Sequence, residues 1–253
     1  MVDWVGNAPA APAETAGNVP VHPDTSLAER LMTELAVYLE IGPRRTFAGA
    51  VEWPGWCRSG SGEDAALEAL VAYGTRYRSA MGTAGRGLVL PKSLRGLTVA
   101  ERLAGDATTD FGAPAARPVA DDRPLEGAEL SRQVRILEAC WSAFDRAADA
   151  AAGAVLRTGP RGGGRDVEKM RAHVADGDAG YLSRLGGKLS RDSGGDAEEL
   201  HSVYVETVTA RSRGDVPDRG PRGGLRWPAR YAIRRSAWHA LDHAWEIEDR
   251  VEV

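Results

Sequence analysis

Apolar and polar residues alternate over a short segment in the first quarter of the chain. Between residues 35 and 41, Leu, Val, Leu and Ile occupy every second position, which is the period of a half-buried β-strand. A Gly-Pro pair follows and predicts a turn. Residues 45–53 then predict a second strand, which a Pro-Gly pair ends.

After a glycine-rich loop the pattern changes to helical spacing. Residues 63–79 place apolar side chains three and four positions apart, as an amphipathic helix does. Residues 97–103 are again typical of a strand. These segments together predict a small α/β unit over residues 27–112, preceded by a disordered, Ala- and Pro-rich tail at 1–26.

From residue 129 onward the spacing of apolar residues is helical throughout. A linker rich in Ala, Pro and Asp, residues 113–128, separates this region from the α/β unit. Four long helices without intervening strands favour an up-down four-helix bundle over residues 129–253, so that the fold class is α+β. The predicted helices cover residues 130–152, 166–185, 196–211 and 229–251.

Composition restricts the functions open to such a fold. The chain has 253 residues, and a net charge of −4 argues against a dedicated nucleic-acid binder, which is usually basic. Two cysteines cannot build a disulfide framework or a four-cysteine zinc site. The sequence has no apolar stretch long enough to span a membrane. We therefore expect a cytoplasmic protein, without membrane contact, that acts on a small molecule.

The histidines carry the strongest chemical signal in the sequence. Only five occur, and His239 and His243 lie four residues apart in the last predicted helix. This spacing places both imidazoles on one helix face, with Cβ atoms about 5–6 Å apart. Two nitrogens then converge on one ion, as in other HxxxH metal-binding pairs.

A third histidine lies at a comparable depth in another helix. His173 comes about eight residues into the second predicted helix, and His239 about ten residues into the fourth. Since the second and fourth helices of an up-down bundle run parallel, the matching depth predicts that the three imidazoles meet. Three neutral imidazoles bind one divalent ion and leave a coordination position open.

Charged residues near these histidines have several open roles. Glu246 falls on the same helix face as the pair and is interpreted as a fourth ligand, as an acceptor that holds a ligand histidine, or as a general base. Asp242 is a less well placed alternative, and a simple ion pair between Glu246 and Arg250 would explain the residue without chemistry. Asp176, three residues after His173, is a second candidate for moving protons.

A Gly-Pro-Arg-Gly-Gly motif occurs before both the second and the fourth predicted helix. Parallel helices would place both motifs at one end of the bundle, where Arg161 and Arg222 would hold the anionic end of a substrate. Two flexible connectors are the simpler interpretation.

The segments that carry the histidines resemble the DinB-like superfamily. The resemblance rests on residues 169–176, KMRAHVAD, and 234–246, RRSAWHALDHAWE. Members include bacillithiol- and mycothiol-dependent S-transferases and maleylpyruvate isomerases, and they are four-helix bundles that hold a divalent metal. The resemblance implies His173, His239 and His243 as ligands and zinc or nickel as the metal, with iron and copper as alternatives. It also implies a low-molecular-weight thiol as a co-substrate.

The N-terminal unit has a weaker likeness of its own. Residues 47–60, FAGAVEWPGWCRSG, and the Ala-rich helix that follows resemble the core of HicB-type antitoxins. In that family a strand ends in a Pro-Gly turn, and a glycine leads into an acidic helix. No DNA-binding element follows here, so we expect the unit to cover the substrate or to form a homodimer.

The residues and the resemblances together favour a metal-dependent transferase, isomerase or hydrolase. In such an enzyme Glu246 or Asp176 moves protons, and the substrate is small and anionic. The alternative is a non-catalytic binding or regulatory protein that holds a structural metal and contacts a partner through the HicB-like unit. A closed fourth ligand would distinguish this alternative, because structural metal sites lack an open position.

Overall fold

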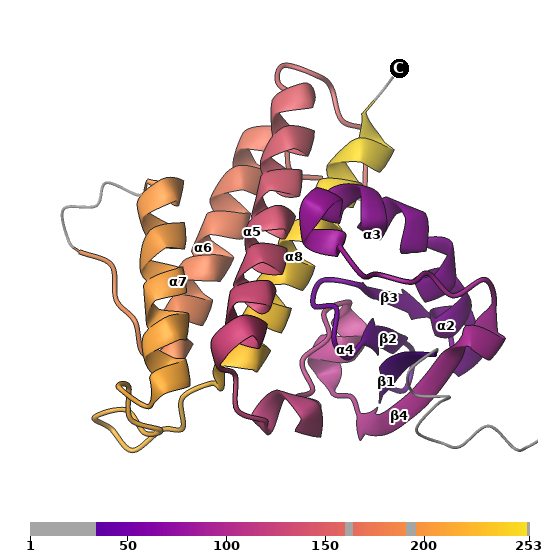
Figure 1. Ribbon diagram of the computed structural model, residues 1–253. Coiled ribbons are helices and arrows are strands. Elements are labelled where there is room, and N and C mark those ends of the chain that lie inside the picture. Colours follow the sequence, from indigo (N-terminus) through magenta and orange to yellow (C-terminus); the bar gives the residue numbers. More distant parts are fainter. Residues whose placement is uncertain (1–33, 160–163, 191–195, 252–253) are drawn as a thin grey trace, which may run out of the picture.

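The computed structural model describes residues 34–159, 164–190 and 196–251, and it combines a sheet with many helices (Figure 1). The predicted α+β class is confirmed. The tail predicted at 1–26 lies outside the described residues. Within the described chain, no helix combines the length and the apolar composition that crossing a membrane requires.

A four-stranded mixed sheet organises the N-terminal part. Its strands are β1 Leu35–Ile41, β2 Thr46–Ala50, β3 Cys57–Gly60 and β4 Leu97–Ala104. The order across the sheet is β3-β2-β1-β4, and β1 pairs antiparallel with β2 and parallel with β4. β1 covers the alternating segment of the sequence, and Val37 and Leu39 are fully buried because one face of the strand packs into the core.

The second predicted strand is shorter in the structure, and β3 was not predicted. β2 ends at Ala50, and the chain turns through Gly55 before it pairs back along β2 as β3. Gly55 has a φ of 87°, and a Cβ there would lie 2.9 Å from Cδ1 of Leu241 and 3.1 Å from Sγ of Cys140. The tip of this turn therefore packs directly against two of the long helices.

The helix predicted over residues 63–79 is divided into two. α2 (Glu63–Ala72) and α3 (Gly74–Met81) are separated by one residue, since a glycine at the start of α3 weakens a continuous helix. The ring of Tyr77 in α3 stacks on Trp56 with centroids 5.2 Å apart, which holds α3 against the turn between β2 and β3. The shorter helical elements of the chain are η1 Gly82–Gly85, η2 Leu94–Gly96, α4 Ala107–Phe111 and η3 Val119–Asp122.

The segment predicted as a linker, residues 113–128, connects the sheet to the first long helix and packs against both. The carboxylate of Glu40 in β1 is completely buried and accepts hydrogen bonds from two successive amides of this segment, at 2.9 Å each. It also accepts one from the hydroxyl of Thr109. These bonds satisfy the buried charge and fix the path of the segment.

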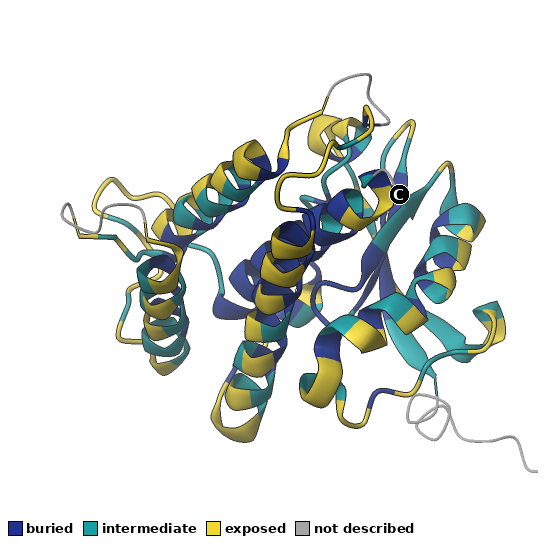
Figure 2. Cartoon of the chain, turned by 90° about the horizontal axis from the view of Figure 1, so that it is seen from above, coloured by how far each residue is buried: buried dark blue, intermediate teal, exposed yellow. Residues whose placement is uncertain are grey.

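Four long helices form the C-terminal part, and each begins and ends within three residues of its predicted bounds. They are α5 Gly127–Ala150, α6 Val167–Leu185, α7 Ala197–Arg213 and α8 Ala229–Arg250. α8 lies in the middle of the molecule, and 18 of its 22 residues are buried. Figure 2 shows this concentration of buried residues at the centre, with exposed residues on the outer faces of the helices.

The predicted up-down connectivity of the bundle is wrong: α6 and α8 run antiparallel. The amide of Trp227, just before α8, donates to the carbonyl of Arg184 near the end of α6 at 2.9 Å. At the other end of the bundle, Nη2 of Arg250 in α8 donates to the carbonyl of Arg165, just before α6. Arg211, near the end of α7, donates to the carbonyl of Trp227, so α7 is parallel to α6.

Arg230 at the start of α8 forms an ion pair with Glu129 at the start of α5, so these two helices are parallel. The order of the four helices is up, down, down, up. The prediction rested on the absence of strands between the four helices, which does not determine the direction of each helix. A fully extended chain with as many residues as separate α6 from α7 reaches about 36–40 Å, whereas α6 itself is about 28 Å long. The number of residues between the two helices therefore allows both to begin at the same end of the bundle.

One hydrophobic core continues from the sheet into the helices, and a buried arginine joins the two parts. Arg234 of α8 donates two hydrogen bonds to the carboxylate of Asp121 in η3, at 2.7 Å each. It also donates to the carbonyls of Ala50 and Val51 at the end of β2, at 2.8 and 2.7 Å. The N-terminal part thus lies against α5 and α8 on one side of the bundle (Figure 1).

Candidate metal centre

The antiparallel arrangement of α6 and α8 brings three histidines to one level. His173 lies six residues after the start of α6, and His243 lies seven residues before the end of α8. Because the two helices run in opposite directions, these positions face each other across the helix interface. His239 lies one helical turn before His243 in α8. The predicted meeting of the three residues is therefore found, although the parallel arrangement used to predict it is not.

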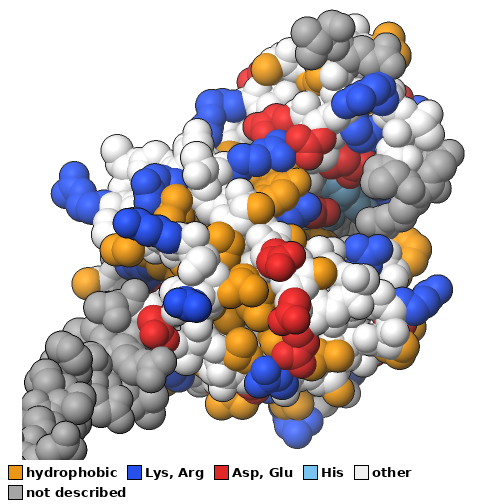
Figure 3. Space-filling model, turned by 90° about the vertical axis from the view of Figure 1, so that its right-hand side faces the viewer, with side chains coloured by type: hydrophobic (Ala, Val, Ile, Leu, Met, Phe, Trp, Pro, Cys, Tyr) orange, Lys and Arg blue, Asp and Glu red, His pale blue; other side chains and the backbone are white. Residues whose placement is uncertain are grey.

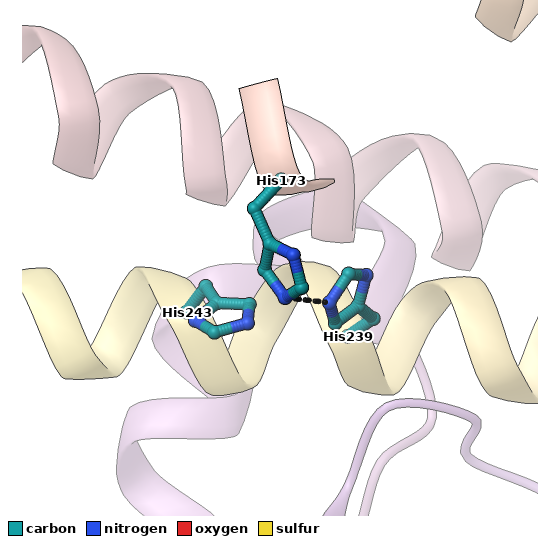
Figure 4. A group of neighbouring side chains, drawn as sticks. All are labelled: His173, His239 and His243. Carbon is teal, nitrogen blue, oxygen red and sulfur yellow. Dashed lines mark hydrogen bonds between the residues drawn. The ribbon is translucent and has the colours of Figure 1, made fainter. Parts of the chain in front are cut away.

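The three imidazoles form a nearly regular triangle (Figure 4). Their ring centroids are 4.8 to 5.0 Å apart, and each pair of rings is inclined by 74° to 83°. Nε2 of His239 and Nε2 of His173 approach to 3.2 Å, and one ring nitrogen from each of the three residues lies within 4.8 Å of the others. Among the described residues this is the only group of three or more His, Cys, Asp or Glu with such convergence.

Glu246 holds one of these histidines in a defined orientation. Its Oε2 lies 2.9 Å from Nδ1 of His243, so the carboxylate accepts a hydrogen bond when Nδ1 carries the proton. Its Oε1 accepts from Nη1 of Arg250 at 2.8 Å. This chain of contacts leaves Nε2 of His243 free to bind an ion, and Glu246 takes the place of an acceptor behind the ligand rather than that of a fourth ligand.

The environment of His173 and His239 favours their neutral form. Burial, reinforced by the neighbouring His243 and His173, lowers the pKa of His239 from 6.5 to about 2. Burial and then His243 also lower the pKa of His173. The hydrogen bond from His243 is the main cause that lowers the pKa of Glu246, so its carboxylate is charged. A neutral imidazole has the lone pair that a metal requires.

The shape of the site also fits a bound ion. The ring of His239 is 6% exposed and lies against Gly177 of α6, which has no side chain to occupy the same space. Its Nδ1 is buried and has no hydrogen-bond partner among the described residues. The hydrogen-bonding contact of this imidazole in the described chain is therefore the one from Nε2 to His173, the nitrogen that would face a shared ion.

A cleft of about 740 Å³ opens beside the histidines, between α8 and the sheet. His243 and Glu246 form part of its wall, and the opposite wall comes from the start of β2 and from β3. Histidine surface is visible on this side of the molecule, next to acidic and basic side chains (Figure 3). The arginines that line the cleft are Arg45, Arg58, Arg165 and Arg250.

The comparison with known proteins found no relative of this chain. No family model, curated protein or solved structure matches the chain. The resemblances to the DinB-like superfamily and to HicB-type antitoxins therefore stay predictions.

The other residues predicted from the sequence lie apart from the triangle. Asp176 is exposed on α6, and its charge acts on His173 only by opposing the lowering of its pKa. Asp242 forms an ion pair with Arg58 of β3 at 3.1 Å. Arg222 is exposed in the connection before α8, and Arg161 lies outside the described residues. Since α6 and α8 are antiparallel, the segments that enter them lie at opposite ends of the bundle and do not form one rim.

Sequence reasoning missed the residues that the sheet and α6 contribute. Arg45 and Ser59 face the cleft because β3 pairs with β2, and β3 itself was not predicted. Gly177 could have been noticed in the sequence, because a glycine inside a helix lowers the stability of the helix by about 1 kcal/mol relative to alanine. It lies four residues after His173 and therefore on the same helix face.

Proposed function

We propose that the protein is an enzyme that depends on a divalent metal and acts on a small anionic substrate by thiol transfer, isomerisation or hydrolysis. The observation that carries the proposal is the convergence of His173, His239 and His243 beside a cleft, with Glu246 engaged behind one of them. Three imidazole ligands and an open side are typical of catalytic rather than structural sites.

The donor set suits zinc or nickel, since imidazole nitrogens prefer borderline metals. When bound, such an ion polarises a carbonyl group or lowers the pKa of a water or thiol. The chain's own residues supply the rest. The hydrogen bond from Nδ1 of His243 to Glu246 fixes the ring and keeps its proton on the side away from the ion.

Glu246 is a positioning residue in this proposal. Both of its carboxylate oxygens are engaged, one by His243 and one by Arg250, and these contacts lower its pKa. A carboxylate of lowered pKa is a weak base, which favours this positioning role for Glu246 over proton transfer. Asp176 is the remaining candidate for accepting a proton from the substrate. The cleft arginines supply positive charge for an anionic substrate.

Metal analysis of the protein purified without a histidine tag tests the metal site. We expect about one equivalent of metal in the wild type and none in His239→Ala or His173→Ala. His201→Ala is the matched control, because His201 lies on α7 outside the group and should leave the metal content unchanged. A wild-type protein that takes up no zinc, nickel, cobalt, iron or copper after reconstitution would refute the proposal.

A second measurement separates a catalytic from a structural metal. In the cobalt-substituted protein, an added small thiol changes the visible absorption spectrum if a coordination position is open. We expect such a change in the wild type. An unchanged spectrum would indicate a closed site and favour the non-catalytic binding protein.

A further inference from the structure

Four arginines of α8 are buried, and one of them has no carboxylate partner. The three paired ones are Arg230 with Glu129, Arg234 with Asp121, and Arg250 with Glu246. Arg235 is 9% exposed, yet it makes no ion pair with any residue that the structure describes. An unpaired buried charge is costly for folding, so its presence calls for an explanation.

The surroundings of Arg235 supply aromatic rings instead of acceptors. Its guanidinium carbon lies 5.5 Å from the ring centroid of Tyr181 in α6 and 5.3 Å from that of Trp238. Nη2 donates a long hydrogen bond to the hydroxyl oxygen of Tyr181, at a distance of 3.4 Å. Nε and Nη1 are buried and find no acceptor among the described residues. The rings hold the guanidinium in place and leave its hydrogen-bond donors free.

Trp238 adds a second unsatisfied donor at the same place. Its Nε1 is buried and likewise has no partner in the described part of the chain. The indole packs edge-to-face on Phe47, with centroids 6.2 Å apart, and Phe47 lines the cleft beside the metal centre. Two neighbouring side chains of α8, Arg235 and Trp238, therefore both carry buried donors without acceptors among the described residues.

We infer that Arg235 and Trp238 form a binding subsite for the carboxylate of a small organic acid. Arg235 lies one helical turn before His239 on the same face of α8, which corresponds to about 6 Å along the helix axis. The inference rests on the proposed function only in placing the reacting group of this acid at the metal, about 6 Å from its carboxylate. Binding of the carboxylate itself depends on the donors of α8.

A carboxylate fits this subsite better than a phosphate does. The guanidinium presents its donors in a plane, and a carboxylate accepts two of them in parallel. The rings of Tyr181 and Trp238 lie beside the guanidinium and offer apolar contact to a flat ligand bound to it. One arginine and one indole N–H balance a single negative charge, whereas a phosphate dianion needs further cations. The substrate class is therefore a short monocarboxylate, or one carboxylate of a longer acid.

Calorimetric titration with glycolate tests the subsite, with glycolamide as the neutral analogue of the same shape. Both ligands are titrated at constant ionic strength into zinc-loaded and into metal-free protein. We expect glycolate to bind both forms and glycolamide to bind the metal-free form at least tenfold more weakly. Arg235→Met should weaken glycolate binding at least tenfold, and Trp238→Phe, which loses one hydrogen bond, about fivefold. Arg95→Met, on the exposed surface before β4, is the control and should bind as the wild type does.

Equal binding of glycolate and glycolamide to metal-free protein would overturn the inference, as would wild-type affinity in Arg235→Met. If Arg235→Met does not fold, Arg235→Lys and Trp238→Phe decide, because Arg235→Lys keeps the charge, Trp238→Phe keeps an aromatic ring, and each loses part of the donor set. Wild-type affinity in both variants would overturn the subsite.

The failure of the subsite and the failure of the proposed function can be distinguished. A protein that binds glycolate through Arg235 but takes up no metal would refute the proposed function alone. Metal uptake without glycolate binding would refute the subsite alone.

Discussion

Gly177 of α6 lies directly against the imidazole of His239 in α8. A Cβ at Gly177 would stand 2.5 Å from Cε1 and 2.7 Å from Nδ1 of that ring, closer than real Cβ atoms approach. The ring is 6% exposed and packed by its neighbours, so it has little room to move away. The position of this imidazole therefore depends on the absence of a side chain one turn after His173.

We expect Gly177→Ala to weaken metal binding by about tenfold or more, because it displaces one ligand from the triangle. Gly180→Ala is the matched control, since a Cβ at Gly180 meets nothing within 4 Å on the same helix. That substitution should leave metal affinity unchanged and raise the free energy of unfolding by about 0.5–1 kcal/mol. Competition titration with a chelator measures both affinities. Equal affinities for the two variants would show that the His239 ring does not need the space at Gly177.

The contact between Glu246 and His243 gives a second prediction. Residues that hold a ligand histidine from behind typically contribute 10–100-fold (about 1.4–2.7 kcal/mol) to metal affinity. Glu246→Ala should therefore weaken zinc binding by about this factor, and Glu246→Gln less, because the amide oxygen still accepts from Nδ1. Glu248→Ala is the control, since Glu248 pairs only with Arg76 on the surface. Zinc affinity that stays at the wild-type level in Glu246→Ala would contradict a positioning role.

Local pattern predicted β1 and the long helices because apolar residues recur in the sequence at the period of each element. Leu35, Val37, Leu39 and Ile41 alternate with less apolar residues, although Tyr38 and Glu40 between them are buried as well. β3 has only one buried residue, Cys57, and three partly exposed ones, so its pattern is that of a loop. Its pairing with β2 makes it a strand, and that pairing is a tertiary event.

The three-histidine group was predicted correctly from an incorrect topology. The HxxxH spacing depends only on helical geometry, which the sequence determines well. The depth of His173 was matched to His239 for parallel helices, but the match survives reversal because His239 lies at nearly the same distance from both ends of α8. The predicted rim of Arg161 and Arg222 depended on parallel helices, and in the structure the starts of α6 and α8 lie at opposite ends of the bundle.

The donors around Arg235 could not be found from the sequence. Four arginines of one helix look alike in sequence, and their differences arise from the partners that other elements supply. Asp121 reaches Arg234 from a segment more than a hundred positions earlier in the chain. The packing of the other elements against α8 therefore determines which of its arginines has no carboxylate partner among the described residues.

The lowered pKa of His239 predicts how the metal-free protein responds to acid. In the folded state its pKa is about 2, whereas the unfolded chain has the ordinary value of 6.5. As the pH falls through 6.5, the unfolded state takes up a proton that the folded state does not, so the stability present above 6.5 is lost. His239 alone then removes about 1.4 kcal/mol from the free energy of unfolding between pH 7.5 and 5.5.

Urea unfolding of metal-free wild type and His239→Gln at these two pH values measures this contribution. The variant should lose about 1.4 kcal/mol less than the wild type on acidification, because its side chain does not titrate. His201→Gln serves as a control that keeps His239 and should retain the larger loss. The same loss in wild type and His239→Gln would show that the ring is protonated in the folded protein at pH 5.5.

The ion pair between Arg234 and Asp121 predicts that the sheet and the bundle unfold together. Arg234 also donates to two carbonyls at the end of β2, so it joins α8, η3 and the sheet at one buried point. Arg234→Met leaves the Asp121 carboxylate, which is 1% exposed, without its cation. Breaking a buried pair in this way costs about 3–5 kcal/mol.

Arg76→Met is the matched comparison, because Arg76 also joins the N-terminal part to α8 but pairs with Glu248 and Asp249 near the surface. Its loss should cost about 1 kcal/mol or less. Urea unfolding followed by both tryptophan fluorescence and far-ultraviolet circular dichroism measures each variant. We expect a single transition by both probes for Arg76→Met and a transition at much lower urea for Arg234→Met. A small, equal cost for the two variants would show that the buried arginine does not hold the sheet to the bundle.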